Sequence, residues 1–174
     1  MRKGEFDSEM TPPCRERKTK SAEQALQLLM HLCARGERST GDALRLMRTW
    51  GVPEGERAAV VERLVAQRYI DNRRYAEAYT REKSNLAGWG PKKIALQLRL
   101  KGIESNIISE TLREIDDDAR RTHLDERLRR KLRTTKAASS YELRGKLLRY
   151  ALSLGYDYDM AHSAVDSLVS EESL

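Results

Sequence analysis

The chain carries clusters of arginine and lysine whose spacing suits the binding of anionic partners. The densest cluster spans residues 120–136, which hold eight basic and two acidic side chains. The candidate contact residues within it are Arg127, Arg129, Arg130, Lys131 and Arg133. Cations gathered on one helix can bind nucleic-acid phosphates or an acidic protein surface. The alternative is a solvated helix, because acidic residues at its start and basic residues at its end also complement the helix macrodipole.

Two smaller basic clusters precede this one. No acidic residue occurs between Pro91 and Ile103, and the cations of that stretch are Lys92, Lys93, Arg99 and Lys101. The other cluster contains Arg73 and Arg74 together with Arg81 and Lys83, and glutamates are interleaved with it. A solvated helix face would explain each cluster alone. A joint binding role requires that the clusters share one face of the fold.

Residues for catalysis or metal binding do not come together in the sequence. The three histidines and two cysteines lack metal-ligand spacing, and no CxxC motif occurs. Neither a GxxxxGK[ST] phosphate loop nor a GxGxxG motif is present. The aspartates at residues 116–118 point in different directions on a helix. The sequence therefore predicts a binding protein that is not an enzyme and uses no cofactor or metal.

Composition excludes several classes of protein. Charged residues make up 34% of the 174 residues, aromatic residues only 6%, and the formal net charge is +6. No apolar stretch approaches the roughly 20 residues that a membrane span needs. Two cysteines, Cys14 and Cys33, and no signal peptide predict a cytoplasmic protein.

The elements that must position the cations are all predicted to be helices. No segment alternates with period two, and after residue 20 apolar residues recur at helical spacing. Three copies of one pattern align on Gly51, Gly102 and Gly155. In each copy a helix ends at the glycine, an apolar residue follows and another helix begins. The sequence therefore predicts an all-α fold, an elongated array of three tandem three-helix repeats. Such small units bury little surface alone and should lean on their neighbours.

The expected organisation has five parts along the chain. A disordered N-terminal arm covers residues 1–20, and a C-terminal tail covers residues 171–174. The three repeats lie between them at residues 21–70, 71–115 and 116–170. Trp89 is expected to anchor packing between helices, and the protein is expected to be a monomer.

The central repeat resembles a known family. The run YIDNRRYA at residues 69–76, GPKKI at 90–94 and the L-x-x-K-G-I pattern at 98–103 resemble the central signature of RecX proteins, regulators of the RecA recombinase. The resemblance covers about residues 21–170, and the third repeat is the most divergent. Asn72 stands where the family commonly has a second acidic residue.

This resemblance implies binding in the groove of the RecA–DNA filament, with inhibition of recombinase ATPase and strand exchange in DNA repair and the SOS response. It also implies weak, non-specific contact with single- and double-stranded DNA. Lys92, Lys93 and Lys101 fall in the matched motif and are expected to contact the filament. Arg73 is either a contact or a structural ion-pair partner, for example of Asp71.

The alternative is a helix-turn-helix-like DNA-binding protein, since such modules also consist of three helices. The predicted third helices argue against it, because Val60, Val61, Ile107 and Ile108 make them apolar rather than rich in base-reading side chains.

Overall fold

The computed structural model describes residues 19–171, and every regular element within that range is a helix. The predicted arm up to residue 18 and the tail from residue 172 lie outside the described residues. The helices are α1 (Ala22–Arg35), α2 (Thr40–Thr49), α3 (Glu54–Ala66), α4 (Asn72–Asn85), α5 (Pro91–Leu100), α6 (Ser105–Arg113), α7 (Asp117–Leu132), α8 (Ser140–Ser153) and α9 (Tyr158–Glu171).

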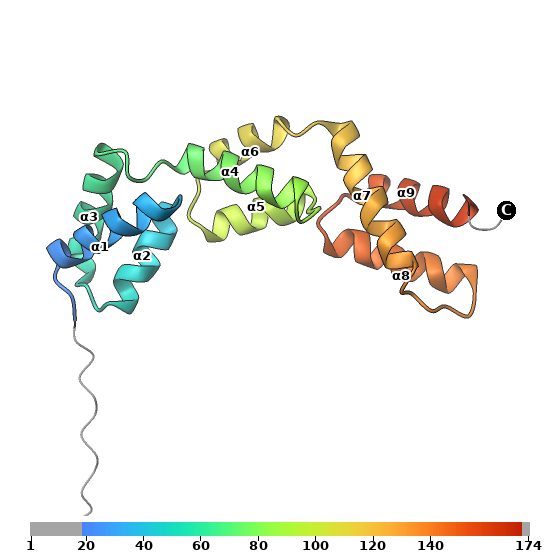
Figure 1. The fold of residues 1–174 in the computed structure, drawn as a ribbon, viewed down its shortest axis with the longest axis horizontal. Coiled ribbons are helices and arrows are strands. Elements are labelled where there is room, and N and C mark those ends of the chain that lie inside the picture. Colours follow the sequence, from blue (N-terminus) through green and yellow to red (C-terminus); the bar gives the residue numbers. More distant parts are fainter. Residues whose placement is uncertain (1–18, 172–174) are drawn as a thin grey trace, which may run out of the picture.

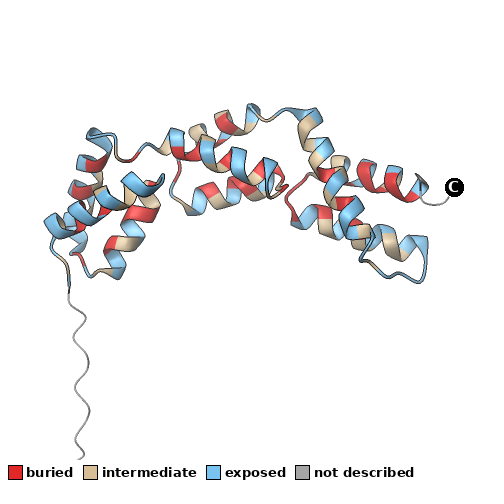
Figure 2. Ribbon diagram, in the orientation of Figure 1, coloured by how far each residue is buried: buried red, intermediate tan, exposed pale blue. Residues whose placement is uncertain are grey.

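Each consecutive trio of helices encloses its own hydrophobic core, and the trios follow one another in a curved, elongated array (Figure 1). Buried positions gather where the helices of one trio face each other (Figure 2). The centres of the three cores are Leu26, Met47 and Leu64, then Ala76, Ile94 and Leu98, then Leu124, Leu147 and Ala151. The predicted all-α array of three-helix repeats is therefore confirmed. We propose residues 21–70, 71–115 and 116–170 as the bounds of its units.

The aligned glycines mark one recurring turn between the second and third helix of each repeat. Gly51, Gly102 and Gly155 have φ angles of +72°, +73° and +92°, a backbone conformation that residues with a side chain rarely adopt. The residue after each glycine is buried, and its N–H donates to a carbonyl five residues earlier. The repeat in the sequence thus has a local physical cause.

The same turns also join the repeats. The carbonyl before Gly102 accepts a hydrogen bond from the Gly41 N–H at 3.1 Å, and the carbonyl before Gly155 accepts one from the Gly90 N–H at 2.8 Å. In the first repeat, the carbonyl before Gly51 accepts one from the Lys20 N–H at 2.9 Å. Residue 20 therefore occupies the position that a preceding repeat would otherwise fill.

Trp89 anchors the second junction, as predicted. Its ring is partly buried and packs against both the second and the third core. The Lys93 Nζ atom lies 4.5 Å from the ring centroid and the Lys83 Nζ atom 5.6 Å, so both cations interact with the ring.

Two buried tyrosines make stability sensitive to alkaline pH. Burial raises the pKa of Tyr75 and of Tyr156 from 10.0 to about 12. In the unfolded chain these phenols ionise near pH 10, before they do in the folded protein, so the free energy of unfolding should fall as pH rises from 10 to 12. Urea unfolding at pH 8 and pH 11 measures the loss, which should be smaller in the Tyr75→Phe/Tyr156→Phe variant. An equal loss in both proteins would contradict the assignment.

Candidate partner interface

Charge in this fold depends on the position of a helix within its repeat. The second helices α2, α5 and α8 together hold eight basic and two acidic residues, whereas the third helices α3, α6 and α9 hold three basic and seven acidic residues. In Figure 1, α2, α5 and α8 follow the lower edge of the array, and α6 and α9 lie above α5 and α8. We call α2, α5 and α8 with their exposed cations the basic row.

Helix α5 presents the middle of this row. Its buried face consists of Ile94, Ala95 and Leu98, so the side chains on the opposite face of the helix point outward. Lys92 and Arg99 are exposed and form no ion pair within residues 19–171. Leu96 and Leu100 share this face and are 52% and 71% exposed. The outer surface of α5 is therefore both cationic and apolar.

The end of α7 extends the row beside α8. Lys131 places its ammonium 5.5 Å from the Tyr150 ring of α8, which brings the basic end of α7 next to the second helix of its repeat. Arg129, Arg130 and Arg133 are exposed at this end. Arg127 lies farther back and donates to the Leu86 carbonyl at 2.9 Å, so it links α7 to the end of α4. Part of the candidate cluster thus faces solvent while Arg127 joins two repeats.

Arg73 and Arg74 are held by carboxylates of other helices and loops. Arg73 pairs with Glu110 of α6, and this hydrogen bond raises the pKa of its guanidinium. Arg74 pairs with Glu37 at 2.6 Å, which raises its pKa in the same way. The suggested pairing of Arg73 with Asp71 was wrong, because Arg73 pairs with Glu110. Asp71 caps α4 by accepting a hydrogen bond from the Arg74 backbone N–H.

Two lysines of the matched motif lie at junctions between repeats. Lys93 donates to the Ser153 carbonyl at 3.3 Å and stacks on Trp89. Lys101 donates to Asp42 of the first repeat at 2.8 Å. The Asp42 side chain is only 4% exposed and also accepts from Arg45 at 2.7 Å. Both lysines therefore connect neighbouring repeats, and Lys92 is the exposed lysine of the motif.

Removing the Lys101 ammonium should weaken the first junction. In a Lys101→Met variant the buried Asp42 carboxylate keeps only Arg45, so we expect a loss of about 1–3 kcal/mol in the free energy of unfolding. Arg99→Met changes an exposed neighbour and should stay within about 0.5 kcal/mol of the parent. Urea unfolding of the two variants measures the difference, and equal stabilities would show that the Asp42 bridge contributes nothing.

Asn72 was a departure from the family pattern, and its role was not visible in the sequence. Asp71 is the N-cap of α4, and Asn72 is the first residue of the helix. The Asn72 amide instead accepts from the Thr40 N–H at 3.1 Å and donates to Thr40 Oγ1 and to the Glu104 carboxylate. It thus joins the starts of α2, α4 and α6 across the first junction.

Among residues 19–171, no group of three or more histidine, cysteine or carboxylate side chains is placed to hold a metal ion. None of the described helices is long and apolar enough to cross a membrane. The molecule is a three-repeat helical scaffold whose second helices are rich in basic residues and whose third helices are rich in acidic ones.

Comparison with known proteins shows what this chain is similar to. A family model described as the second three-helix domain of RecX matches residues 71–112. The regulatory protein RecX of Mycolicibacterium vanbaalenii is 29% identical over 160 residues, covering 88% of this chain and 87% of its own. RecX of Mycolicibacterium smegmatis is 28% identical, covering 86% and 82%. A crystal structure of RecX from Lactobacillus salivarius superposes with a TM-score of 0.72 at 21% identity, covering 84% and 96% of the two chains. The chain is thus similar to RecX regulatory proteins over most of its length, and its central repeat matches the second three-helix domain of that family.

Proposed function

We propose that this protein binds in the groove of the RecA–DNA filament and restrains ATP hydrolysis and strand exchange by the recombinase. The observation that carries the proposal is the basic row, which spans all three repeats on a single edge of the array. A long cationic body suits a groove that winds past nucleic acid and acidic protein surface. Its bound position would obstruct entry of a DNA duplex.

The side chains of the row favour a mixed partner. Lys92 and Arg99 can bind phosphates or carboxylates, but the exposed leucines of α5 need apolar protein surface to be buried. Contact with the recombinase therefore supplies specificity in this proposal, and contact with single- or double-stranded DNA is weak and independent of sequence. The protein acts as a monomer, because a single chain already presents the whole row.

Recombinase ATPase on single-stranded DNA tests the proposal. Substoichiometric amounts of the protein should lower the steady-state rate, since one elongated molecule lies across more than one recombinase subunit. The control adds the same protein at high salt, where cationic contacts are screened. An unchanged ATPase rate, together with tight binding to one duplex sequence, would overturn the proposal and support the helix-turn-helix alternative.

A further inference from the structure

An open groove lies between α8 and α9 of the third repeat. Its volume is about 540 Å³, and sites for small ligands usually measure about 300–1,000 Å³. Along each helix the lining recurs at every fourth residue, which places these residues on one face of the helix. They are Tyr141, Gly145 and Arg149 on α8, and Tyr158, His162 and Asp166 on α9. Each face spans about two helical turns, roughly 11 Å.

The floor of the groove is apolar, and a glycine leaves it open. Val165 is 2% exposed, and Leu148 packs against the third core. Gly145 lies inside α8, although glycine is a poor helix former. A Cβ atom at this position would meet no atom within 4 Å, so packing does not require a glycine here. Without a side chain at residue 145, the groove extends down to the backbone of α8.

Aromatic side chains flank this floor. Tyr141 is 86% exposed and Tyr158 is 55% exposed, and they are the aromatic members among the exposed large apolar side chains of residues 19–171. The His162 ring adds to them, with its centroid 5.5 Å from that of Tyr158. Aromatic residues make up only 6% of the chain, and core packing does not explain two exposed rings on one groove. Exposed rings beside an apolar floor suit a flat aromatic ligand.

The carboxylates of the groove are already neutralised by neighbouring cations. Glu142 pairs with Lys146 at 2.7 Å, and this hydrogen bond lowers the pKa of the Glu142 carboxyl. Asp166 lies 3.2 Å from His162 Nδ1 and 3.4 Å from the Arg144 guanidinium. These two carboxylates therefore do not exclude an anionic ligand.

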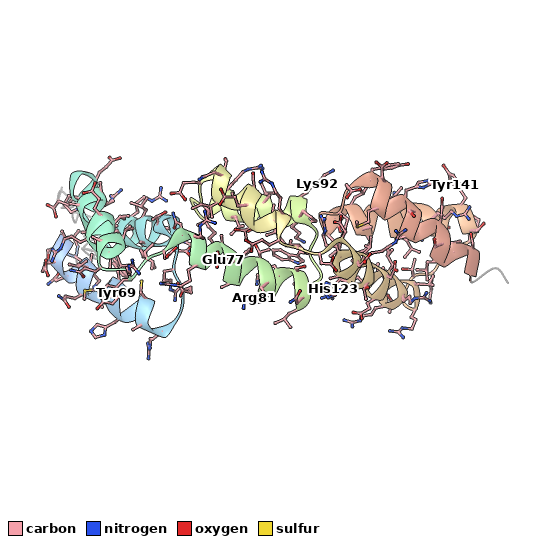
Figure 3. All side chains as sticks on the ribbon, turned by 90° about the horizontal axis from the view of Figure 1, so that it is seen from above. Tyr69, Glu77, Arg81, Lys92, His123 and Tyr141 are labelled. Atoms are coloured by element: carbon pink, nitrogen blue, oxygen red, sulfur yellow. The ribbon has the colours of Figure 1, made fainter. Side chains whose placement is uncertain are left out.

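Arg149 leaves the groove with a cation of its own. It is exposed and forms no ion pair within residues 19–171. The basic end of α7 lies next to α8, where the Lys131 ammonium is 5.5 Å from the Tyr150 ring. Tyr141 lies along the same edge of the array as Lys92 of the basic row (Figure 3). The groove therefore combines exposed rings with the cations of this row.

We propose that this groove binds an unpaired base of single-stranded DNA. Tyrosine rings stack on the flat face of any base, and the apolar floor suits the ring system of the base. Arg149 then binds a neighbouring phosphate. The bases of a duplex are stacked inside the double helix and cannot enter the groove, so the site distinguishes single from double strands. The proposal rests on the proposed function only for contact with DNA, and it names where the single strand binds.

Binding of a fluorescently labelled oligothymidylate, which forms no duplex, tests the proposal at low salt. Tyr141→Ala/Tyr158→Ala should bind it at least about tenfold more weakly, because each lost ring removes a stacking contact. Tyr141→Phe/Tyr158→Phe keeps both rings and should bind like the parent. A labelled duplex should bind equally to all three proteins, since it contacts them through phosphates.

Gly145→Leu separates binding from folding. Leucine is a good helix former, and its side chain at this position would project into the groove. The variant should unfold at the temperature of the parent or above it, and it should bind the oligonucleotide at least about fivefold more weakly. Weaker binding by a variant of undiminished stability cannot come from misfolding.

The matched control is Leu86→Ala, which removes a side chain that is 77% exposed and lies outside the groove. It should bind the oligonucleotide like the parent. The proposal is overturned if the parent does not bind the oligonucleotide, if the tyrosine-to-alanine variant keeps its affinity, or if that variant loses as much affinity for the duplex.

Recombinase ATPase, measured on the same variants, separates this proposal from the proposed function. If the tyrosine-to-alanine variant binds the oligonucleotide like the parent but no longer lowers the ATPase rate, the groove receives protein, so the base site is overturned and the proposed function stands. If the parent does not lower the ATPase rate while the variants lose oligonucleotide binding as expected, the proposed function fails and the base site stands.

Discussion

Replacing Gly155 with alanine is expected to destabilise the protein by about 2–4 kcal/mol and to loosen the junction between the second and third repeats. The Gly155 φ angle of +92° is unfavourable for any residue with a Cβ atom. A Cβ at this position would also lie 2.4 Å from the backbone nitrogen and the Cβ of Lys93, which are parts of α5 that cannot easily withdraw. The turn or the docking of α5 must therefore shift. Urea unfolding measures the loss of stability, and small-angle scattering measures the change in the maximum dimension.

Gly145→Ala is the matched control, ten residues earlier in the same repeat. Gly145 lies inside α8, and a Cβ there would meet no atom within 4 Å. Alanine should stabilise this helix by up to about 1 kcal/mol, because glycine is a poor helix former. Alanine should thus lower the free energy of unfolding at Gly155 and raise it at Gly145. Full stability of the Gly155→Ala variant would contradict the role assigned to the recurring turn.

Reversing charge on the basic row is expected to weaken filament binding by about tenfold to a hundredfold at low salt. The variant is Lys92→Glu/Arg99→Glu, which changes two exposed cations of α5 that have no ion-pair partner among the described residues. The fold should persist, since neither side chain is buried. The dependence of affinity on salt concentration should also become shallower, because fewer cationic contacts remain to be screened. Titration of labelled protein onto the filament at several salt concentrations measures both effects.

A control for net charge is Arg35→Glu/Arg113→Glu. These arginines are exposed, lie at the ends of α1 and α6, and belong to neither the basic row nor its extension on α7. Their reversal changes the net charge by the same amount and should reduce binding much less. Equal losses in the two double variants would mean that overall charge drives binding and that the second helices have no special role.

The repeat architecture could be predicted because its causes are local. A glycine turn followed by a buried apolar residue recurs at Gly51, Gly102 and Gly155, and the apolar spacing of each helix defines its buried face. The charge difference between second and third helices was also accessible in principle. A count of charge by helix position within the predicted repeat reveals it.

The partners of individual cations could not be predicted, because they come from distant parts of the chain. Glu110 lies 37 residues from Arg73, and Asp42 lies 59 residues from Lys101. The motif that carries the family resemblance contains residues that join repeats, such as Lys93 and Lys101, beside the exposed Lys92. Thr80 Oγ1 on α4 is buried without a hydrogen-bond partner among the described residues, and no sequence pattern indicates this.

Site-specific photo-crosslinking tests the central claim, that the basic row faces the filament, most directly. A photoreactive residue replaces Leu96 on α5 in one variant and Val65 on α3 in another, and both positions are exposed apolar sites, 52% and 46% accessible. After irradiation on assembled RecA–DNA filaments, position 96 should crosslink to the recombinase, and position 65 should crosslink far less. Efficient crosslinking from position 65 with none from position 96 would contradict the account.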